Sequence, residues 1–386
     1  MPHIGSRLNN LFDVYPSSSG RDPLNIPSPI RAFLRTSLLV VLPTLVLCLT
    51  MLEVGLRLMG RAPSNVTHGI FEQWGHTYRL QANMNKQIRT ASFSFTVNTN
   101  AYGFRDRVPG PRALGPAPYF AFVGDSATFG NGVDYDDSFV GVFARFAVPR
   151  GIDVINLAVG GHRVLEQEKL LKDFLAVAKP ARVVIVFTSQ FILHFDLSVE
   201  TLVKDGYLLP RDNWLIPYLK VRLQDASAVY GFFAESIRKI QGPLSGSLNH
   251  SSHESPWALP ATVARFEARL TSVDELIRKV GAEPVYVYLP MASDLEADEF
   301  LAIAGKNAAD HDLFQPVKLV KAHANRSGVA FVDLTPALKR LRAAGKPLTF
   351  LRDPHYTAGV NHVIGQVLAE TLLGQGEASM VSVVGH

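Results

Sequence analysis

From Pro118 onward, the sequence alternates between short apolar runs and longer amphipathic segments. The apolar runs are YFAFVG at 119–124, IDVINLAV at 152–159, RVVIVF at 182–187, PVYVYLP at 284–290 and VAFVDL at 329–334. Runs of this size suit buried strands, and the segments between them have helical periodicity. Because this alternation is typical of parallel sheets covered by helices, we predict an α/β fold, a three-layer sandwich around a central parallel five-stranded sheet.

This predicted domain covers 118–375, followed by a C-terminal tail at 376–386. An insertion at about 195–255 interrupts the alternation with aromatic and polar sequence. Two interpretations remain open for its aromatic residues, which either stack on sugar rings or cover the core of a cap. These residues are Tyr207, Trp214 and Tyr218. The preceding 59–117 is predicted to be a connector with one short strand, in the alternating sequence SFSFTVNTN.

An apolar segment near the N-terminus indicates a membrane anchor. The sequence TSLLVVLPTLVLCLTML, between Arg35 and Glu53, contains no charged residue. A helix of this length covers roughly 26 Å, just enough to cross the hydrocarbon core of a bilayer. We therefore predict a transmembrane helix over 31–58, with the lipid bilayer as its partner. A buried core helix and a cleaved signal peptide are the alternatives, but a long flank precedes the segment and no clean cleavage site follows it.

Arginines are more numerous before this segment than directly after it. Four precede it and two follow closely: Arg7, Arg21, Arg31, Arg35, then Arg57 and Arg61. Since positive residues favour the cytoplasmic side, the N-terminus is predicted to be cytoplasmic, with 1–30 as a disordered tail. The chain is then a single-pass protein of the cell inner membrane, with its large domain periplasmic or extracellular.

Composition excludes several classes of function. The formal charge is only +4, and the basic residues are scattered, so nucleic acid is not an expected partner. The single cysteine, Cys48, lies in the apolar segment, which leaves no disulfide framework and no thiolate metal site. The histidines form no recognisable metal-ligand spacing with carboxylates. We therefore expect neither a metal nor another cofactor.

A serine follows the first predicted strand of the domain. The strand ends in Phe122-Val123-Gly124-Asp125-Ser126, and a helix is expected shortly afterwards. Open α/β sheets bind their ligands at the carboxyl ends of strands, so Ser126 is well placed for catalysis. Gly124 permits a tight turn, and the N–H groups at a helix start could face an oxyanion. Alternatively, Ser126 only caps the helix.

A serine hydroxyl needs a base to become a nucleophile, and the C-terminal part of the chain supplies one. Asp353-Pro354-His355 precedes the last predicted helix. We predict that His355 takes the proton of Ser126, while Asp353 holds the other ring nitrogen and fixes the tautomer. Alternatively, His355 is a solvent-exposed residue at a helix start, and Asp353 can also act as a helix cap.

Three sequence blocks in this order resemble the SGNH/GDSL hydrolases: Gly124-Asp125-Ser126, Asn156-Leu157-Ala158-Val159-Gly160-Gly161 and Asp353-x-His355. The resemblance covers about 118–374. It implies that Ser126 is the nucleophile and His355 the general base, and that the Gly160 backbone N–H donates to the oxyanion. The earlier segment ending in Gly103-Phe104-Arg105 resembles the region before the domain in bacterial members with one N-terminal helix.

One block departs from the family pattern. After the third strand, members usually carry an asparagine whose amide donates to the oxyanion, often followed by aspartate. Here the strand runs into Thr188-Ser189-Gln190, so Ser189 and Gln190 stand at those positions. Either side chain could still donate. Loss of one such donor typically lowers the rate on the order of 10² to 10³.

The sequence therefore predicts a membrane-anchored extracytoplasmic serine esterase or O-acyltransferase. Its substrate would be an acylated small molecule or glycan, such as an envelope polysaccharide. The alternative is a weakly active or inactive SGNH-fold protein that binds or assembles such polysaccharides. Arg105 either holds the connector against the domain or binds substrate. His162 is interpreted as a surface residue near the mouth of the site.

Overall fold

The computed structural model describes residues 36–59, 69–75, 77–90, 92–111, 118–188, 201–241, 260–295, 315–351 and 353–374, together with residues 29 and 33. The chain divides into two compact units, Met1–Gly60 and Arg61–His386. The predicted tails at 1–30 and 376–386 lie outside the described residues, apart from residue 29.

The continuously described part of the first unit, 36–59, is a single long helix. It begins with a π-helical turn, η1 (Ser37–Val41), and continues as α2 (Leu42–Leu58). Pro43 lies where the π-helical turn passes into α2, and its missing N–H interrupts the helical hydrogen-bond ladder at that point. The 20 residues Leu39–Leu58 are long and apolar enough to span a membrane, and their side chains are largely exposed. This finding agrees with a membrane-spanning segment by length and composition.

The second unit is built around an eight-stranded sheet with the strand order β12-β11-β8-β6-β7-β5-β4-β3. Its first five members are parallel and correspond to the five predicted strands. They are β6 (Tyr119–Val123), β7 (Asp153–Asn156), β8 (Arg182–Phe187), β11 (Glu283–Tyr288) and β12 (Ala330–Asp333). The α/β prediction is confirmed, but the sheet is larger than the predicted five strands because segments before residue 118 join it.

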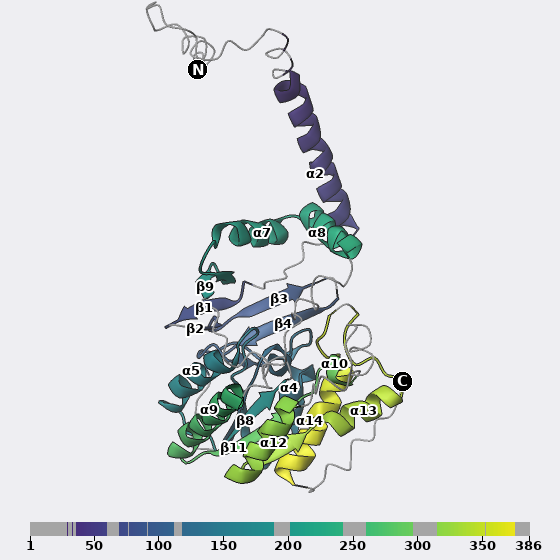
Figure 1. The fold of residues 1–386 in the computed structure, drawn as a ribbon. Helices are drawn as coiled ribbons and strands as arrows, with labels where there is room; N and C mark the ends of the chain where they lie inside the picture. Colours follow the sequence, from purple (N-terminus) through teal and green to yellow (C-terminus); the bar gives the residue numbers. More distant parts are fainter. Residues whose placement is uncertain are drawn as a thin grey trace, which may run out of the picture. The chain divides into compact units, whose positions relative to one another are not determined.

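Helices cover both faces of the parallel strands (Figure 1). One face carries α5 (Val164–Leu175), α9 (Pro260–Lys279) and α12 (Gln315–Ser327). The other carries α4 (Phe139–Ala147), α13 (Thr335–Ala343) and α14 (Ala358–Leu373). Successive residues of a strand point to opposite faces, so Ala121 packs in one core and Phe120 and Phe122 in the other. The result is a three-layer sandwich.

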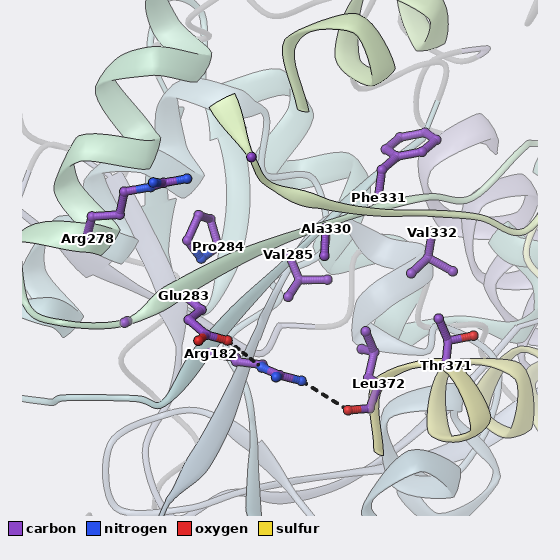
Figure 2. Close-up of a pocket in the computed structure, with 12 residues that line it drawn as sticks. Arg182, Arg278, Glu283, Pro284, Val285, Ala330, Phe331, Val332, Thr371 and Leu372 are labelled. Carbon is purple, nitrogen blue, oxygen red and sulfur yellow. Dashed lines mark hydrogen bonds and ion pairs between the residues drawn. The ribbon is translucent and has the colours of Figure 1, made fainter. Parts of the chain in front are cut away.

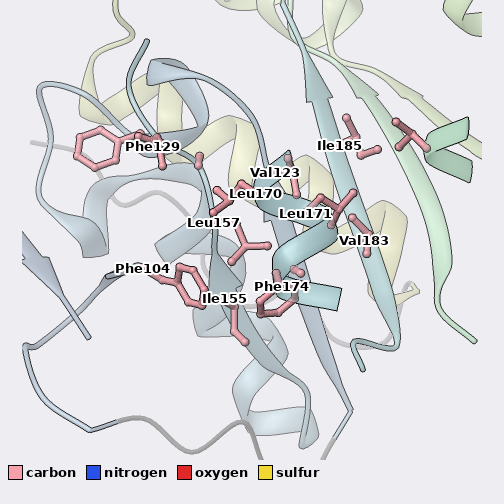
Figure 3. Close-up of a cluster of buried hydrophobic side chains, with 14 of the residues drawn as sticks. Phe104, Val123, Phe129, Ile155, Leu157, Leu170, Leu171, Phe174, Val183 and Ile185 are labelled. Atoms are coloured by element: carbon pink, nitrogen blue, oxygen red, sulfur yellow. The ribbon is translucent and has the colours of Figure 1, made fainter. Parts of the chain in front are cut away.

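The prediction of a connector with one short strand was wrong about its structure. The described residues of 59–117 contain five strands: β1 (Phe71–Trp74), β2 (Thr77–Leu80), β3 (Asn85–Arg89), β4 (Ser94–Thr99) and β5 (Arg105–Asp106). β3, β4 and β5 extend the large sheet antiparallel beyond β7. Figure 3 shows part of the shared core, where Phe104 before β5 meets Phe174 of α5, with ring centroids 5.5 Å apart.

The described part of the predicted insertion, 201–241, contains a hairpin and two helices. The hairpin pairs β9 (Thr201–Lys204) with β10 (Tyr207–Pro210), and α7 (Leu215–Ala226) and α8 (Ala228–Gln241) follow. Main-chain contact links the hairpin to the start of the domain, because the Phe71 N–H donates to the Gly206 carbonyl oxygen at 3.1 Å. The three aromatic residues of this segment have different surroundings. Tyr207 is buried, whereas the rings of Trp214 and Tyr218 pack against each other.

Candidate active site

Ser126 begins a one-turn helix, α3 (Ser126–Phe129), directly beyond the carboxyl end of β6. β6 lies between β7 and β8, so Ser126 stands where the sheet changes its winding direction. The turn requires Gly124, since a Cβ at this position would lie 2.0 Å from Thr128 Oγ1. The helix ends at Gly130, which has a φ of 81°. Glycine at both ends thus allows the sharp turn that presents Ser126.

Asp125 fixes this turn with both carboxylate oxygens. As the N-cap of α3, it accepts a hydrogen bond from the Ala127 N–H at 2.9 Å through Oδ1. Its Oδ2 accepts one from Thr188 Oγ1, at the end of β8, at 2.7 Å. The turn that carries Ser126, called the nucleophile turn below, is therefore tied to the end of β8. Both carboxylate oxygens of Asp125 accept hydrogen bonds that hold this turn.

The predicted base and its orienter lie on the loop before α14. Asp353 Oδ1 accepts hydrogen bonds from the backbone N–H of His355 at 3.0 Å and from its ring Nδ1 at 2.6 Å. Two residues of separation suffice because the loop folds back on itself, as in an Asx turn. The next residue, Tyr356, anchors the loop by donating its hydroxyl to the carbonyl oxygen of Pro290.

Ser126, His355 and Asp353 form one continuous chain of hydrogen bonds. His355 Nε2 lies 2.8 Å from Ser126 Oγ, while its Nδ1 faces Asp353. With Nδ1–H donating to the carboxylate, Nε2 carries the lone pair that can accept the serine proton. The side chains of His355 and Asp353 are 19% and 24% exposed, so the site is reachable from solvent. The fold brings together residues separated by 229 positions in the sequence.

Gly160 lies beside the serine. A Cβ on Gly160 would lie 4.0 Å from the Ser126 Cβ, and no described residue accepts a hydrogen bond from the Gly160 N–H. The buried Asn156 shapes this loop, because its Nδ2 donates to the Thr128 carbonyl at 3.1 Å and its Oδ1 accepts from the Ala158 N–H at 3.0 Å. Asn156 thus joins the loop after β7 that contains Gly160 and Gly161, called the glycine loop below, to the nucleophile turn.

Arg105 is fully buried and holds the segment that follows α3. Its guanidinium donates to the carbonyl oxygens of Phe129, Gly130 and Val133, the last two at 2.7 and 2.6 Å. Burial lowers the pKa of Arg105 to about 10, and the group stays charged at neutral pH. Of the two interpretations from the sequence, the structure supports the one in which Arg105 holds the connector against the domain.

His162 is also buried, so its interpretation as a surface residue was wrong. Its Nε2 lies 2.8 Å from the carbonyl oxygen of Tyr78, and its ring packs edge-on against the Tyr78 ring. Burial lowers the pKa of His162 to about 4, which leaves the ring neutral. The sequence analysis could not identify this role because it did not predict β2, the strand that carries the partner Tyr78. The neighbouring Gly161 adopts a φ of 83°, where a Cβ would approach the Tyr78 hydroxyl to 2.9 Å.

Sequence reasoning missed Asn131. Its Nδ2 lies 3.2 Å from His355 Nδ1, and its backbone N–H donates to the Ser126 carbonyl at 3.0 Å. Asn131 thus contacts both the nucleophile segment and the base. Its place after Gly130 is the only sequence signal that pointed to it. The predicted oxyanion donors Ser189 and Gln190 lie outside the described residues, so their positions stay predictions.

A second buried cluster of similar composition has a different arrangement. His323 Nε2 lies 2.9 Å from Asp274 Oδ2 and 3.3 Å from Ser327 Oγ. A proton relay needs the acid and the serine on different ring nitrogens, and here both face the same one. The Tyr286 hydroxyl also donates to Asp274. This cluster therefore joins α9, α12 and β11. Among the described residues, no group of three potential ligands is placed to hold a metal ion.

A cavity lies at the other end of the parallel strands (Figure 2). It measures about 580 Å³ and is lined near the starts of β8, β11 and β12. Arg182 lies on its wall, with Nε 2.9 Å from Glu283 Oε2 and Nη1 donating to the Leu372 carbonyl at 3.0 Å. Ser126 follows the carboxyl end of β6, so this cavity is not part of the candidate active site.

No protein-family model and no curated protein matches this chain. The chain is similar to several solved structures, each at low sequence identity. TesA is 14% identical with a TM-score of 0.38, and the match covers 66% of this chain and 98% of TesA. A G-D-S-L family lipolytic protein from Veillonella parvula is 13% identical with a TM-score of 0.40, covering 67% and 99%. A variant of Axe2, an acetyl-xylooligosaccharide esterase from Geobacillus, is 16% identical with a TM-score of 0.40, covering 71% and 100%.

Proposed function

We propose that this chain is a membrane-anchored serine esterase or O-acyltransferase that acts on acyl esters. The observation that carries the proposal is the unbroken chain of hydrogen bonds from Ser126 Oγ through the His355 ring to Asp353. A serine that only capped the helix would need no hydrogen bond from its side chain to a histidine. The arrangement gives the serine a base and gives the base a fixed tautomer, which are the two requirements for a nucleophilic hydroxyl.

The first half of the reaction forms an acyl-enzyme. Ser126 Oγ attacks the ester carbonyl carbon while His355 Nε2 takes the serine proton. The resulting imidazolium is stabilised by the Asp353 carboxylate, which remains ionised. When the tetrahedral intermediate collapses, the bond to the alcohol oxygen breaks. His355 then returns the proton to that leaving alcohol, so charge and protons balance.

The second half resolves the acyl-enzyme. A water molecule or a sugar hydroxyl gives its proton to His355 Nε2 and attacks the acyl carbon. Collapse releases the acid or the new ester, and Ser126 recovers its proton. In both halves, negative charge develops on the former carbonyl oxygen, and the proposed donor to it is the backbone N–H of Gly160, a residue that lies beside Ser126. Water would give an esterase, and a sugar hydroxyl would give a transferase.

The proposed setting is the outer side of the cell inner membrane. The apolar helix Leu39–Leu58 supports a membrane anchor, and the arginines before it favour a cytoplasmic N-terminus. An acylated glycan of the cell envelope is the substrate that fits this location. We infer no cofactor, because the proposed chemistry needs only the side chains and backbone of this chain.

A fluorophosphonate probe tests the nucleophile directly. The detergent-solubilised full chain should be labelled, and Ser126→Ala should lose all labelling. Ser94→Ala, which changes an exposed serine on β4, should be labelled as strongly as the unchanged chain. Absence of labelling in the unchanged chain, or labelling that persists in Ser126→Ala, would contradict the proposal. The first of these results would favour the binding or assembly alternative.

Kinetics on short-chain acyl esters test whether the three residues act together. Ser126→Ala and His355→Ala should each lower kcat on the order of 10⁴ to 10⁶, and the double variant should be hardly slower. Asp353→Asn should cost about 10⁴, because the ring loses its fixed tautomer. His362→Ala, on the exposed side of α14, is the matched histidine control and should retain activity. Independent, multiplicative losses would rule out a triad.

A further inference from the structure

α7 exposes an apolar stripe along one side. Leu215, Ile216, Leu219 and Leu223 are each between 50% and 64% exposed. Leu215, Leu219 and Leu223 follow at successive turns, and Ile216 stands beside them, so together they occupy an arc of about 100°. Isolated exposed leucines are common on soluble proteins, but a continuous stripe of large apolar side chains marks an interaction surface.

Basic residues border this stripe on both sides. At 3.6 residues per turn, Arg222 lies on one edge of the arc and Lys220 on the other, and both are exposed. Long basic side chains at such positions can reach from an apolar layer toward charged headgroups. The opposite face holds α7 to the domain, because the Tyr207 hydroxyl donates to Asp225. The stripe therefore points away from the rest of the unit.

Aromatic residues mark the start of the same helix. Trp214 and Tyr218 pack against each other with ring centroids 6.0 Å apart, and Lys204 Nζ lies 5.2 and 5.5 Å from their centroids. By the same helical geometry both rings lie on the side of α7 that faces the hairpin, where Lys204 and Asp205 contact them, so they support the helix and do not border the stripe. The next helix, α8, adds exposed Phe233 and Ile237.

The stripe lies near the place where the chain enters the domain. Phe71 and Gly206 are joined by a backbone hydrogen bond, and Lys86 Nζ donates to the Gly69 carbonyl oxygen at 3.0 Å. The same hairpin, β9–β10, leads into α7. The chain from Leu58 to Ile70 can extend at most about 40 Å. A domain tethered by a helix in a bilayer therefore has its entry point, and the nearby hairpin, within that distance of the lipid.

We propose that α7 lies in the interface of the same bilayer that holds the N-terminal helix, with its apolar stripe among the acyl chains and Lys220 and Arg222 at the headgroups. This inference rests on the membrane anchoring in the proposed function, and it is independent of the esterase activity. It also brings the glycine loop toward the lipid surface, because Leu208 of β10 neighbours Gly161, where a Cβ would lie 3.8 Å from Leu208 Cδ1.

Site-specific fluorescence tests this contact in the full chain. Cys48→Ala removes the only thiol, and Leu219→Cys then provides a single site for an environment-sensitive dye. The labelled protein is reconstituted into phosphatidylcholine vesicles containing phosphatidylglycerol and a nitroxide-bearing lipid. We expect the nitroxide to reduce the emission at position 219 by at least about half. Glu275→Cys, exposed on α9, is the matched control and should be unaffected.

Two further variants separate the possible results. Adding Leu215→Glu and Leu223→Glu should abolish quenching at position 219, and Lys220→Glu with Arg222→Glu should remove its dependence on anionic lipid. If the chain floats with the vesicles but position 219 stays accessible to a water-soluble quencher, the α7 inference fails and anchoring stands. If the chain does not float with the vesicles, the anchoring itself is wrong. Burial of position 219 without lipid quenching would indicate a protein contact and overturn the inference.

Discussion

At the scale of single residues, two buried basic side chains hold the loops of the candidate site. Arg105 binds three carbonyl oxygens in the segment after the nucleophile helix, and His162 fixes the glycine loop to β2. Neither touches the proposed reacting atoms, so both are positioning residues. Substituting either residue should lower the free energy of unfolding, and any loss of turnover should follow from that loss of stability.

Replacing Arg105 should destabilise the domain strongly. Arg105→Met keeps most of the volume but leaves three buried carbonyl groups without their donor, which we expect to cost at least about 3 kcal/mol. Arg107→Met is the matched control, because Arg107 is half exposed and pairs with Asp136 on the surface; it should cost under about 1 kcal/mol. Denaturant unfolding of both variants measures the difference. Equal losses would show that the buried contacts of Arg105 contribute little.

His162 should make stability depend on pH. Its pKa falls from an ordinary 6.5 to about 4 on folding, so between these values the unfolded chain binds the additional proton. Stability is therefore fully present above pH 6.5 and is lost as the pH falls, by about 3 kcal/mol at pH 4. His162→Gln should flatten this part of the curve of unfolding free energy against pH. His362→Gln, at a half-exposed histidine of α14, is the matched comparison.

At the scale of elements, the strands before residue 118 complete the sheet. β5 pairs with β7 at the register of Arg105 and Asn156, and β4 and β3 continue the sheet outward. Without them, β7 would become an exposed edge and the Arg105 contacts would disappear. The candidate site thus depends on a segment that the sequence analysis treated as a connector.

Truncation tests this dependence. A chain that begins at Arg61 should remain folded and soluble, since it matches the compact second unit. A chain that begins at Pro118 should aggregate or lose its cooperative thermal transition, because it lacks the strands that cover β7. Circular dichroism and size-exclusion chromatography compare the two. A soluble, cooperatively folding shorter chain would show that β3–β5 are dispensable.

The difference between predicted and observed strands has a physical cause. Four of the five parallel strands, β6, β7, β8 and β11, are buried along most of their length, so their sequences are continuous apolar runs that can be recognised directly. β3 has the sequence NKQIR, in which only Ile88 is buried, and β5 has two residues, Arg105 and Asp106. Such strands depend on neighbours that are distant in the sequence, and local patterns do not reveal them.

The same reasoning explains what could be predicted of the candidate site. Ser126 follows a recognisable strand, and Asp353 and His355 lie two positions apart, so their sequence context was informative. Asn131 acts through its contact with the His355 ring, and Asn156 and His162 act through contacts with backbone groups of other elements. Such contacts have no local sequence pattern, so only the folded chain shows what these three residues do.

At the scale of the whole molecule, the orientation in the membrane is the main prediction. Alkaline phosphatase fused after Gly60 should be active, and a cytoplasmic fluorescent reporter fused there should be dark, because the preceding arginines retain the N-terminus inside. Replacing those arginines with glutamine should lower the phosphatase activity. Substituting Arg57 and Arg61 instead should not lower it. The opposite pattern of reporter activity would reverse the orientation.

The order of the site residues along the chain also sets when the proposed enzyme becomes active. Ser126 is synthesised 229 residues before His355. At 5 to 20 residues per second, this interval lasts roughly 10 to 50 s, during which the serine has no base. A chain that terminates early, or that loses its last helix and the loop before it, contains the nucleophile but stays inert. Under the proposed mechanism, biosynthesis would thus delay ester chemistry until the whole domain has been made.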